Sequence, residues 1–282
     1  MQISKVGVVG AGTMGNGIAQ VCATAGLSVT MLDIDQQSLE RGLSTVAGSL
    51  ERLVRKEQLA PADRESALQR IRATTDYADL ADVDLVIEAA SEVEKVKLAI
   101  IQTLAQTVRE EAIIASNTSS MSITRLAAAS GAPNRFIGMH FFNPVPVMQL
   151  VELIRGLQTD DATHQAAERF AELIGKTAIS VRNSAGFAVN RILVPMINEA
   201  VFVLQEGIAS ARDIDEGMRL GCNHVIGPLA LADLIGLDTL LSVMEVFYGS
   251  FNDSKYRPAP LLREMVEAGY LGRKSGQGFY SY

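Results

Sequence analysis

An apolar segment that runs directly into three closely spaced glycines constrains the fold of this chain more than any other feature. Residues 3–10 read ISKVGVVG, which is typical of a buried parallel strand, and Gly10, Gly12 and Gly15 form the pattern GxGxxG. Apolar positions continue at helical spacing, and a second apolar run ends at Asp33. The order of strand, glycine turn, helix, strand and acidic residue predicts the opening of a doubly wound α/β sheet.

The glycine turn also has the chemistry of a dinucleotide site. Its first glycine permits a tight turn, its second lets a pyrophosphate approach the backbone, and its third lets the helix pack closely on the strand. The N–H groups of the helix N-terminus attract phosphate, and Asp33 can accept hydrogen bonds from ribose hydroxyls while repelling a 2′-phosphate. We therefore expect NAD rather than NADP, with FAD as a lesser alternative. The alternative without a ligand is a glycine-rich turn that has only a structural role. The expected cofactor-binding residues of this segment are Gly10, Gly12, Thr13, Met14, Gly15 and Asp33.

Strands and helices alternate through the first two thirds of the chain. Strand candidates are the apolar runs at residues 3–10, 28–32, 85–87, 113–116 and 136–140, with 176–181 as a further strand near the sheet edge. An amphipathic helix is predicted over residues 37–56, with a basic end at Arg52, Arg55 and Lys56. This alternation implies right-handed crossovers and a mostly parallel sheet.

The pattern then becomes purely helical. Apolar side chains recur at helical spacing over residues 189–204, residues 210–213 match a capping box, and residues 227–247 read as another apolar helical run. We predict a Rossmann-type NAD-binding domain at 1–184 and an all-helical domain at 185–282. Surplus apolar surface on a small helical domain favours a homodimer, and docking on the first domain is the alternative.

Length and composition narrow the class of protein further. The chain has 282 residues, enough for about two domains, and its 48% hydrophobic and 20% charged residues are ordinary for a globular protein. It has no apolar run long enough for a membrane span and no secretory-signal layout at its start, so we expect a cytoplasmic location. Two cysteines without zinc-ligand spacing disfavour a disulfide framework or a metal site, and a net charge of −7 disfavours nonspecific nucleic-acid binding.

Three histidines are available for proton chemistry near neutral pH. His140 ends an apolar strand, at the edge of an open α/β sheet where ligands bind, and Glu152 follows closely enough for the chain to fold back. An imidazole held by a carboxylate has a defined tautomer and a higher basicity, which suits a base for an alcohol proton. The structural alternative is a core histidine satisfied by a backbone carbonyl. His164 reads as the polar start of a surface helix and His224 as part of a turn, so His140 is the best placed.

Other polar residues have competing interpretations. Residues 116–120 read SNTSS after a strand, where hydroxyls can bind a nicotinamide or a substrate oxygen, although Ser and Thr are also common helix caps. Asn190, near the start of a long helix, can place its amide in a cleft or simply face solvent. The basic helix end around Lys56 is either a local anion site or a solvated face.

Taken together, these motifs resemble the NAD-dependent 3-hydroxyacyl-CoA dehydrogenases, most closely the short bacterial 3-hydroxybutyryl-CoA dehydrogenases, over essentially the whole chain. The resemblance rests on GAGTMG at 10–15, SNTSS at 116–120, HFFNP at 140–144, LVE at 150–152, GFAVNR at 186–191, GPL at 227–229 and GRKSGQGFY at 272–280. It implies a Rossmann domain and a helical substrate-closing and dimerisation domain. It also implies reversible oxidation of the 3-hydroxyl of an (S)-3-hydroxyacyl-CoA, short-chain 3-hydroxybutanoyl-CoA being expected, with hydride transfer to NAD, as in fatty acid metabolism.

The same resemblance implies roles for individual residues. His140 is the general base that takes the hydroxyl proton, Glu152 orients it, and Ser119 and Asn190 contact the reacting oxygen. The further cofactor contacts that it implies are Glu92, Lys97, Ser119, Asn143 and Lys274. The substrate contacts that it implies are Ser49 and Lys56 for the CoA moiety, together with Ser119 and Asn190.

Two residues depart from the family pattern, and two rival functions stay open. Ala185 stands where the family usually has Pro, and Gln149 stands where Lys is common; neither belongs to the expected chemistry. One rival is a dehydrogenase of a sugar acid of the L-gulonate type on the same scaffold. The other is a non-catalytic NAD-binding structural protein, against which the presence of both His140 and Glu152 argues.

Overall fold

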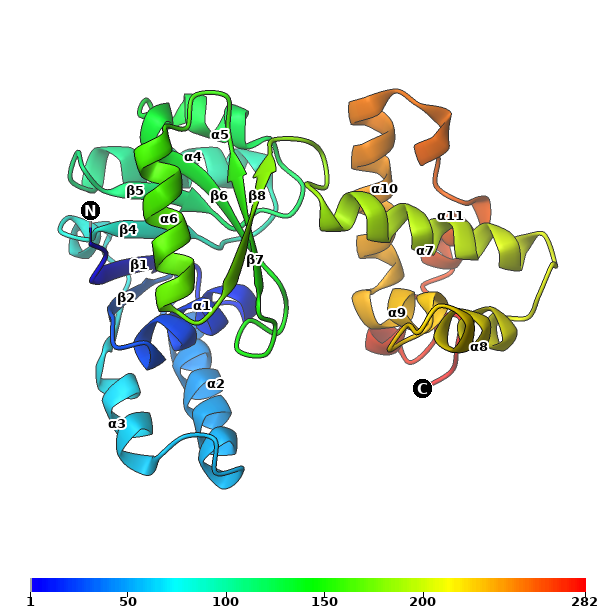
Figure 1. Cartoon of the computed structure of the whole chain (residues 1–282), viewed down its shortest axis with the longest axis horizontal. Coiled ribbons are helices and arrows are strands. Elements are labelled where there is room, and N and C mark those ends of the chain that lie inside the picture. Colours follow the sequence, from blue (N-terminus) through cyan, green and yellow to red (C-terminus); the bar gives the residue numbers. More distant parts are fainter. Residues whose placement is uncertain (1) are drawn as a thin grey trace. The chain divides into compact units, whose positions relative to one another are not determined.

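The computed structural model describes residues 2–282 and contains two compact units, with the boundary between Ser184 and Ala185. The first unit holds a single sheet with helices on both faces, and the second is helical (Figure 1). The predicted fold class, a doubly wound and mostly parallel sheet with a C-terminal helical domain, is confirmed.

Eight strands of the described chain form the sheet. In chain order they are β1 (Lys5–Val9), β2 (Ser28–Leu32), β3 (Ile71–Thr74), β4 (Leu85–Glu88), β5 (Ile113–Ser116), β6 (Phe136–Phe141), β7 (Leu150–Arg155) and β8 (Thr177–Arg182). Their spatial order is β3-β2-β1-β4-β5-β6-β7-β8, and every neighbouring pair is parallel except β6 and β7. The strand order reverses between β1 and β4, and ligands of open α/β sheets bind beyond the carboxyl ends of the strands at such a point.

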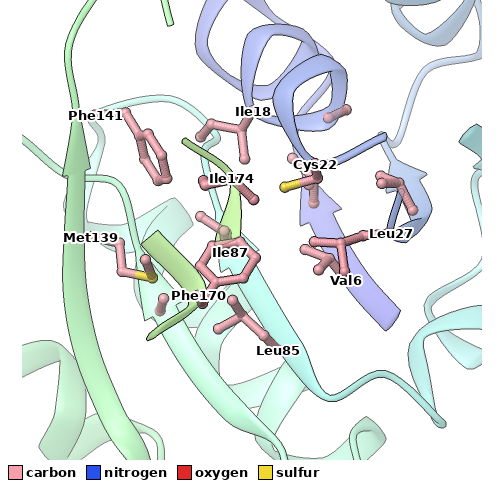
Figure 2. Close-up of a cluster of buried hydrophobic side chains, with 14 of the residues drawn as sticks. Val6, Ile18, Cys22, Leu27, Leu85, Ile87, Met139, Phe141, Phe170 and Ile174 are labelled. Atoms are coloured by element: carbon pink, nitrogen blue, oxygen red, sulfur yellow. The ribbon is translucent and has the colours of Figure 1, made fainter. Parts of the chain in front are cut away.

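Helices cover both faces of this sheet. They are α1 (Thr13–Thr24), α2 (Gln36–Arg55), α3 (Pro61–Gln69), α4 (Glu94–Thr107), α5 (Ile123–Ala129) and α6 (Asp161–Leu173), with short 3-10 helices at Tyr77–Leu80 and Pro133–Arg135. Buried side chains of α1, α2 and α6 share one core with one face of the strands. Figure 2 shows part of that core, where Ile18 and Cys22 of α1 lie with Val6, Ile87 and Phe170. Because side chains alternate along a strand, the residues between these strand positions point to the opposite face, where α4 and α5 pack.

The second unit is built from α7 (Val189–Gln205), α8 (Ala211–Gly221), α9 (Pro228–Ile235), α10 (Leu237–Phe251) and α11 (Pro260–Glu267), with 3-10 helices at Ser254–Tyr256 and Arg273–Ser275. Its core includes Ile197 and Val201 of α7 and Leu240 and Met244 of α10. Of the capping box predicted at residues 210–213, the N-cap is confirmed, because the Ser210 hydroxyl accepts a hydrogen bond from the Asp213 N–H at 3.2 Å; the same hydroxyl donates to Asp213 Oδ2 at 2.6 Å.

Two predictions of local structure need correction. The helical run expected over residues 227–247 is interrupted at Gly236, whose φ of +103° lies outside the helical region and separates α9 from α10. Strands β3 and β7 were not predicted. The sequence predicts only that the segment at 150–152 folds back toward His140, and it does so as a regular strand, β7, paired antiparallel to β6.

Candidate active site

His140 and Glu152 lie directly opposite each other on the antiparallel strands β6 and β7. Their side chains are buried, and His140 Nδ1 lies 2.7 Å from Glu152 Oε2. The Phe142 ring lies 4.6 Å from the imidazole, centroid to centroid. Because Nδ1 faces the carboxylate, proton exchange with a ligand falls to Nε2, and the carboxylate stabilises the imidazolium form. The pair therefore has the geometry of an oriented general base.

Two side chains for which the sequence predicted no role hold the segment that joins β6 to β7: Asn117, which stands in the SNTSS motif, and Lys176. Asn117, just beyond β5, accepts a hydrogen bond from the Phe141 N–H at 2.9 Å. Lys176 is buried, and its ammonium donates to the carbonyls of Val145 at 2.6 Å and Met148 at 2.7 Å. Burial lowers the pKa of this lysine below its ordinary value. These contacts fix the connection between the two strands that carry the histidine and its partner.

The glycine turn has the shape that a dinucleotide requires. Gly10 has a φ of +103°, and a Cβ at Gly15 would lie 1.7 Å from the Gly10 carbonyl oxygen. A Cβ at Gly12, in contrast, would meet nothing within 4 Å. Gly10 and Gly15 are thus required by the protein itself, whereas Gly12 leaves open space at the N-terminus of α1, where N–H groups can receive a phosphate.

A pocket of about 940 Å³ lies over this turn. Its lining includes Gly10, Gly12, Thr13, Met14 and Asp33. Asp33 directly follows β2 and lines the pocket. Its carboxylate accepts a hydrogen bond from the Ala11 N–H at 2.8 Å, which fixes the carboxylate beside the glycine turn. A carboxylate in this place can bind ribose hydroxyls and repels a 2′-phosphate. The residues present therefore fit NAD.

Three residues implied by the resemblance, Glu92, Lys97 and Ser119, share one hydrogen-bonded network. Glu92 Oε1 accepts from the Ser119 N–H at 2.6 Å and from its hydroxyl at 3.2 Å, and the Thr118 hydroxyl donates to Oε2 at 3.0 Å. Lys97 Nζ lies 3.4 Å from Glu92 Oε2 and bonds to both carboxylate oxygens of Glu88, at 2.8 and 2.9 Å. The sequence did not single out Glu88, although its place at the carboxyl end of β4 was a usable signal.

The remaining predicted site residues lie in several elements. Asn143 is exposed in the turn after β6, and Ser49 and Lys56 lie on α2 and at its C-terminal cap. Asn190 is in the first turn of α7, and Lys274 pairs with Asp238 at 2.5 Å; both belong to the second unit. Within the first unit, Ser119 follows β5 and His140 lies near the end of the parallel neighbour β6, so both belong to the carboxyl edge of the sheet.

Other reactive side chains are placed less favourably for catalysis. His164 lies on α6, with Nε2 2.5 Å from the Ser180 hydroxyl, and His224 lies just beyond α8. Burial raises the pKa of the Cys22 thiol to about 12, so this cysteine is not a thiolate nucleophile. Among residues 2–282, no helix combines the length and the apolar character that a membrane crossing requires.

Fold and site together define a class of protein, an NAD-dependent dehydrogenase with a Rossmann domain and a helical second domain. Residues 5–184 match the model of the 3-hydroxyacyl-CoA dehydrogenase NAD-binding domain, and residues 186–282 match that of the 3-hydroxyacyl-CoA dehydrogenase C-terminal domain. The chain belongs to the 3-hydroxyacyl-CoA dehydrogenase family.

Similar proteins cover the chain almost completely. A 3-hydroxybutyryl-CoA dehydrogenase of Bradyrhizobium diazoefficiens is 54% identical over 99% of this chain and 96% of its own length. One of Clostridioides difficile is 46% identical over 99% of both chains. The crystal structure of an (S)-3-hydroxybutyryl-CoA dehydrogenase from Ralstonia eutropha has 63% identity and a TM-score of 0.98 over 100% of this chain and 99% of that one. The predicted family, and its NAD cofactor, are confirmed.

Proposed function

We propose that this chain is an (S)-3-hydroxybutyryl-CoA dehydrogenase, which reversibly oxidises the 3-hydroxyl of a short-chain (S)-3-hydroxyacyl-CoA to a ketone. The observation that carries the proposal is the buried pair of His140 and Glu152, 2.7 Å apart at the ligand-binding edge of an NAD-binding sheet. The names of relatives that are 46% to 63% identical support the substrate class.

The chemistry follows from the orientation of His140. Bound NAD supplies the acceptor for the hydride in oxidation, and NADH supplies the donor in reduction. His140 Nε2 takes the proton of the 3-hydroxyl, while Glu152, on Nδ1, stabilises the positive charge of the imidazolium. In the other direction His140 returns that proton to the oxygen. Ser119 and Asn190 orient the reacting oxygen and stabilise its changing charge.

The remaining predicted site residues are assigned to binding. We assign the pyrophosphate and ribose to residues 10–14 of the glycine turn and to Asp33, which line the pocket described above. Glu92, Lys97, Ser119, Asn143 and Lys274 are assigned to the cofactor, and Ser49 and Lys56 to the anionic CoA, following the family resemblance. The last two lie seven positions apart on or at the end of α2, and residues at this spacing share one helix face, which supports a common ligand.

The second unit is assigned two tasks, closing over the substrate and forming a homodimer. Exposed apolar side chains support the dimer, since Ile192, Leu220 and Val225 are 72%, 78% and 97% exposed. We also propose a cytoplasmic enzyme that works in fatty acid metabolism. Location and pathway rest on the sequence and on the family.

A steady-state assay over substrates tests the proposed function. Purified protein is given NADH or NADPH with acetoacetyl-CoA and longer 3-oxoacyl-CoA substrates, and NAD with L-gulonate. We expect the highest kcat/KM with acetoacetyl-CoA and NADH, because Asp33 repels the 2′-phosphate of NADPH.

Two outcomes would favour the rival functions. Reduction of NAD by L-gulonate without turnover of any acyl-CoA would indicate the sugar-acid dehydrogenase. Binding of NADH without turnover of any substrate in the panel would indicate a non-catalytic NAD-binding protein.

A further inference from the structure

Arg41 is a cation in the lining of the pocket over the glycine turn. It lies in the second turn of α2, and Asp33, to which we assign the adenosine ribose, lines the same pocket. The other cation of the described pocket lining, Lys95, lies on α4. Arg41 is therefore the one of these two cations that stands on the element directly following Asp33.

The carboxylate of Asp33 is held in one orientation by two backbone groups. One oxygen accepts a hydrogen bond from the Ala11 N–H at 2.8 Å, and the other accepts one from the Asp35 N–H at 3.3 Å. A carboxylate fixed in this way can receive ribose hydroxyls and repels a phosphate on the ribose. A 2′-phosphate at this end of the pocket would, however, also be attracted by Arg41.

Asp35 engages the guanidinium of Arg41. Arg41 Nη2 donates to the Ser38 hydroxyl at 2.8 Å and lies 3.4 Å from Asp35 Oδ2. Asp35 is also the N-cap of α2, and the same oxygen accepts from the Ser38 N–H at 3.0 Å and from its hydroxyl at 2.7 Å. The hydrogen bond from the Ser38 hydroxyl, the backbone N–H groups of the helix start and the charge of Arg41 lower the pKa of Asp35 below its ordinary value. Asp35 is thus ionised at neutral pH and competes with any phosphate for Arg41.

We propose that Asp33 and Asp35 select NAD together, with Arg41 as the specificity-determining cation between them. Asp33 repels a 2′-phosphate, and Asp35 occupies the guanidinium that would otherwise bind it. Arg41 contributes little to NAD binding, and it binds a 2′-phosphate once the two carboxylates have lost their charge. Arginine suits this role because its planar fork of N–H donors binds phosphate through two hydrogen bonds at once. This inference rests on the proposed place of the ribose at Asp33.

Binding of NADH and NADPH to isosteric variants tests the proposal. Asp33→Asn and Asp35→Asn each remove one charge and keep an oxygen that accepts from a backbone N–H, and Asn is a good N-cap. The two changes are made singly and together, with and without Arg41→Met. The Kd of each cofactor is measured from its fluorescence. Since only binding is measured, the test does not depend on the identity of the substrate.

Each change has an expected effect on the Kd of NADPH. Asp33→Asn should lower it about tenfold, because the repulsion of the 2′-phosphate is removed. Asp35→Asn should lower it by a further factor of about three, a smaller effect because an exposed ion pair is weak. In the double Asn variant, Arg41→Met should raise it about tenfold and change the Kd of NADH less than about twofold. Lys95→Met in the same background is the matched control and should raise the Kd of NADPH by less than about threefold.

Two results would overturn the role of Arg41. One is a gain in NADPH affinity that survives Arg41→Met. The other is an equal loss with Lys95→Met, which would indicate a general effect of positive charge and not a phosphate site on α2.

Further outcomes separate this proposal from the ones on which it builds. A Kd of NADPH that Asp33→Asn leaves unchanged would contradict the place of the ribose and this proposal with it. If Asp35→Asn lowers the melting temperature, Asp35→Ser replaces it in the same series, because serine also caps helices. If the wild-type protein does not reduce acetoacetyl-CoA, the proposed function fails, whereas NADPH binding still tests Arg41.

Discussion

At the scale of the residue, His140 and Glu152 form one functional unit, because each buried side chain satisfies the other. The 2.7 Å contact places the carboxylate on Nδ1, so the tautomer of the imidazole is set before a substrate arrives. A charge buried at this site would be costly without its partner. The proton transfer proposed at Nε2 therefore depends on Glu152, which faces the other ring nitrogen.

Replacing Glu152 by Gln should lower turnover although the shape of the site is kept. The amide cannot stabilise an imidazolium as a carboxylate does, and it can favour the wrong tautomer, so we expect kcat to fall by at least about tenfold. Steady-state reduction of acetoacetyl-CoA measures the loss. Glu172→Gln, an exposed position on α6, is the matched control. Unchanged kinetics for Glu152→Gln would remove this residue from the site.

Asp84 gives a residue-scale prediction about pH. Burial alone would raise the pKa of Asp84, but hydrogen bonds from Ser4 and Lys5 and the charge of Arg109 outweigh it and lower the pKa below its ordinary value. The folded state therefore binds this proton less tightly than the unfolded state. The stabilisation is present above the unfolded pKa and is lost as the pH falls through the folded one.

Asp84→Asn should accordingly reduce the free energy of unfolding at pH 7 by about 1–3 kcal/mol, with a smaller loss below about pH 4. Urea denaturation at pH 7 and pH 3 measures both values. Asp82→Asn, which removes an exposed partner of Lys5, is the control and should have little effect at either pH. An equal loss for Asp84→Asn at both pH values would contradict the assignment of the stabilisation to the ionised carboxylate.

Some of these residues could be predicted and others could not, for a physical reason. His140 and Glu152 each follow a recognisable pattern, a polar residue at the end of an apolar run and a carboxylate within folding distance. Glu88 also ends an apolar run, at the carboxyl end of β4, but the sequence around Glu88 and Lys176 does not indicate their partners. Their roles depend on which backbone groups and which charges the folded chain places around them, and only the structure shows these.

At the scale of the element, the turn from β1 into α1 contains one glycine that the fold requires and another that leaves space for a ligand. Gly15 must be glycine because a Cβ there would overlap the Gly10 carbonyl. Gly12 meets no such obstacle within the protein. The open space at Gly12 is thus available to a pyrophosphate, and the same sequence pattern serves two different purposes.

Alanine substitutions should distinguish the role of Gly12 in cofactor binding from the role of Gly15 in fold stability. We expect Gly12→Ala to keep the melting temperature but to raise the Kd of NADH at least about tenfold, because the methyl group occupies the place of the pyrophosphate. Gly15→Ala should instead destabilise the fold by about 1–3 kcal/mol, because α1 must move away from β1. Thermal unfolding and NADH fluorescence measure the two effects. A Gly12→Ala variant that binds NADH normally would place the cofactor elsewhere.

Long apolar runs made several strands predictable, but burial alone did not decide the outcome: the largely exposed β8 was predicted, whereas the mostly buried β7, whose apolar run Glu152 interrupts, was not. The strands β1, β4, β5 and β6 are almost wholly buried and read as continuous apolar runs. β3, in contrast, is short and only partly buried, so it lacks such a run. In the second unit, the apolar pattern continues across Gly236, and only the backbone conformation there shows where one helix ends.

At the scale of the whole molecule, the predicted site residues are distributed over both units. The first carries the glycine turn, Asp33 and the His140–Glu152 pair, and the second carries Asn190 and Lys274. The second unit also exposes apolar side chains that a second copy of the chain can cover.

Light scattering should therefore give a mass of about twice the 30.2 kDa of one chain. Val225, the most exposed of the large apolar residues named above, offers a variant: Val225→Asp should weaken the dimer if that surface is covered. Surface-exposed Val147 lies in the first unit, and Val147→Asp serves as the control. A mass of one chain at every concentration tested would contradict the proposed homodimer.

The central claim is that His140 moves the proton in NADH-dependent reduction of acetoacetyl-CoA. The direct measurement is kcat for this reaction in the wild-type protein and in His140→Gln, with His164→Gln as the matched control and the Kd of NADH measured for each. We predict that His140→Gln lowers kcat by at least about 100-fold and leaves NADH binding nearly unchanged, because the proton acceptor is lost but the cofactor site is kept. Near-normal turnover in His140→Gln would contradict the claim.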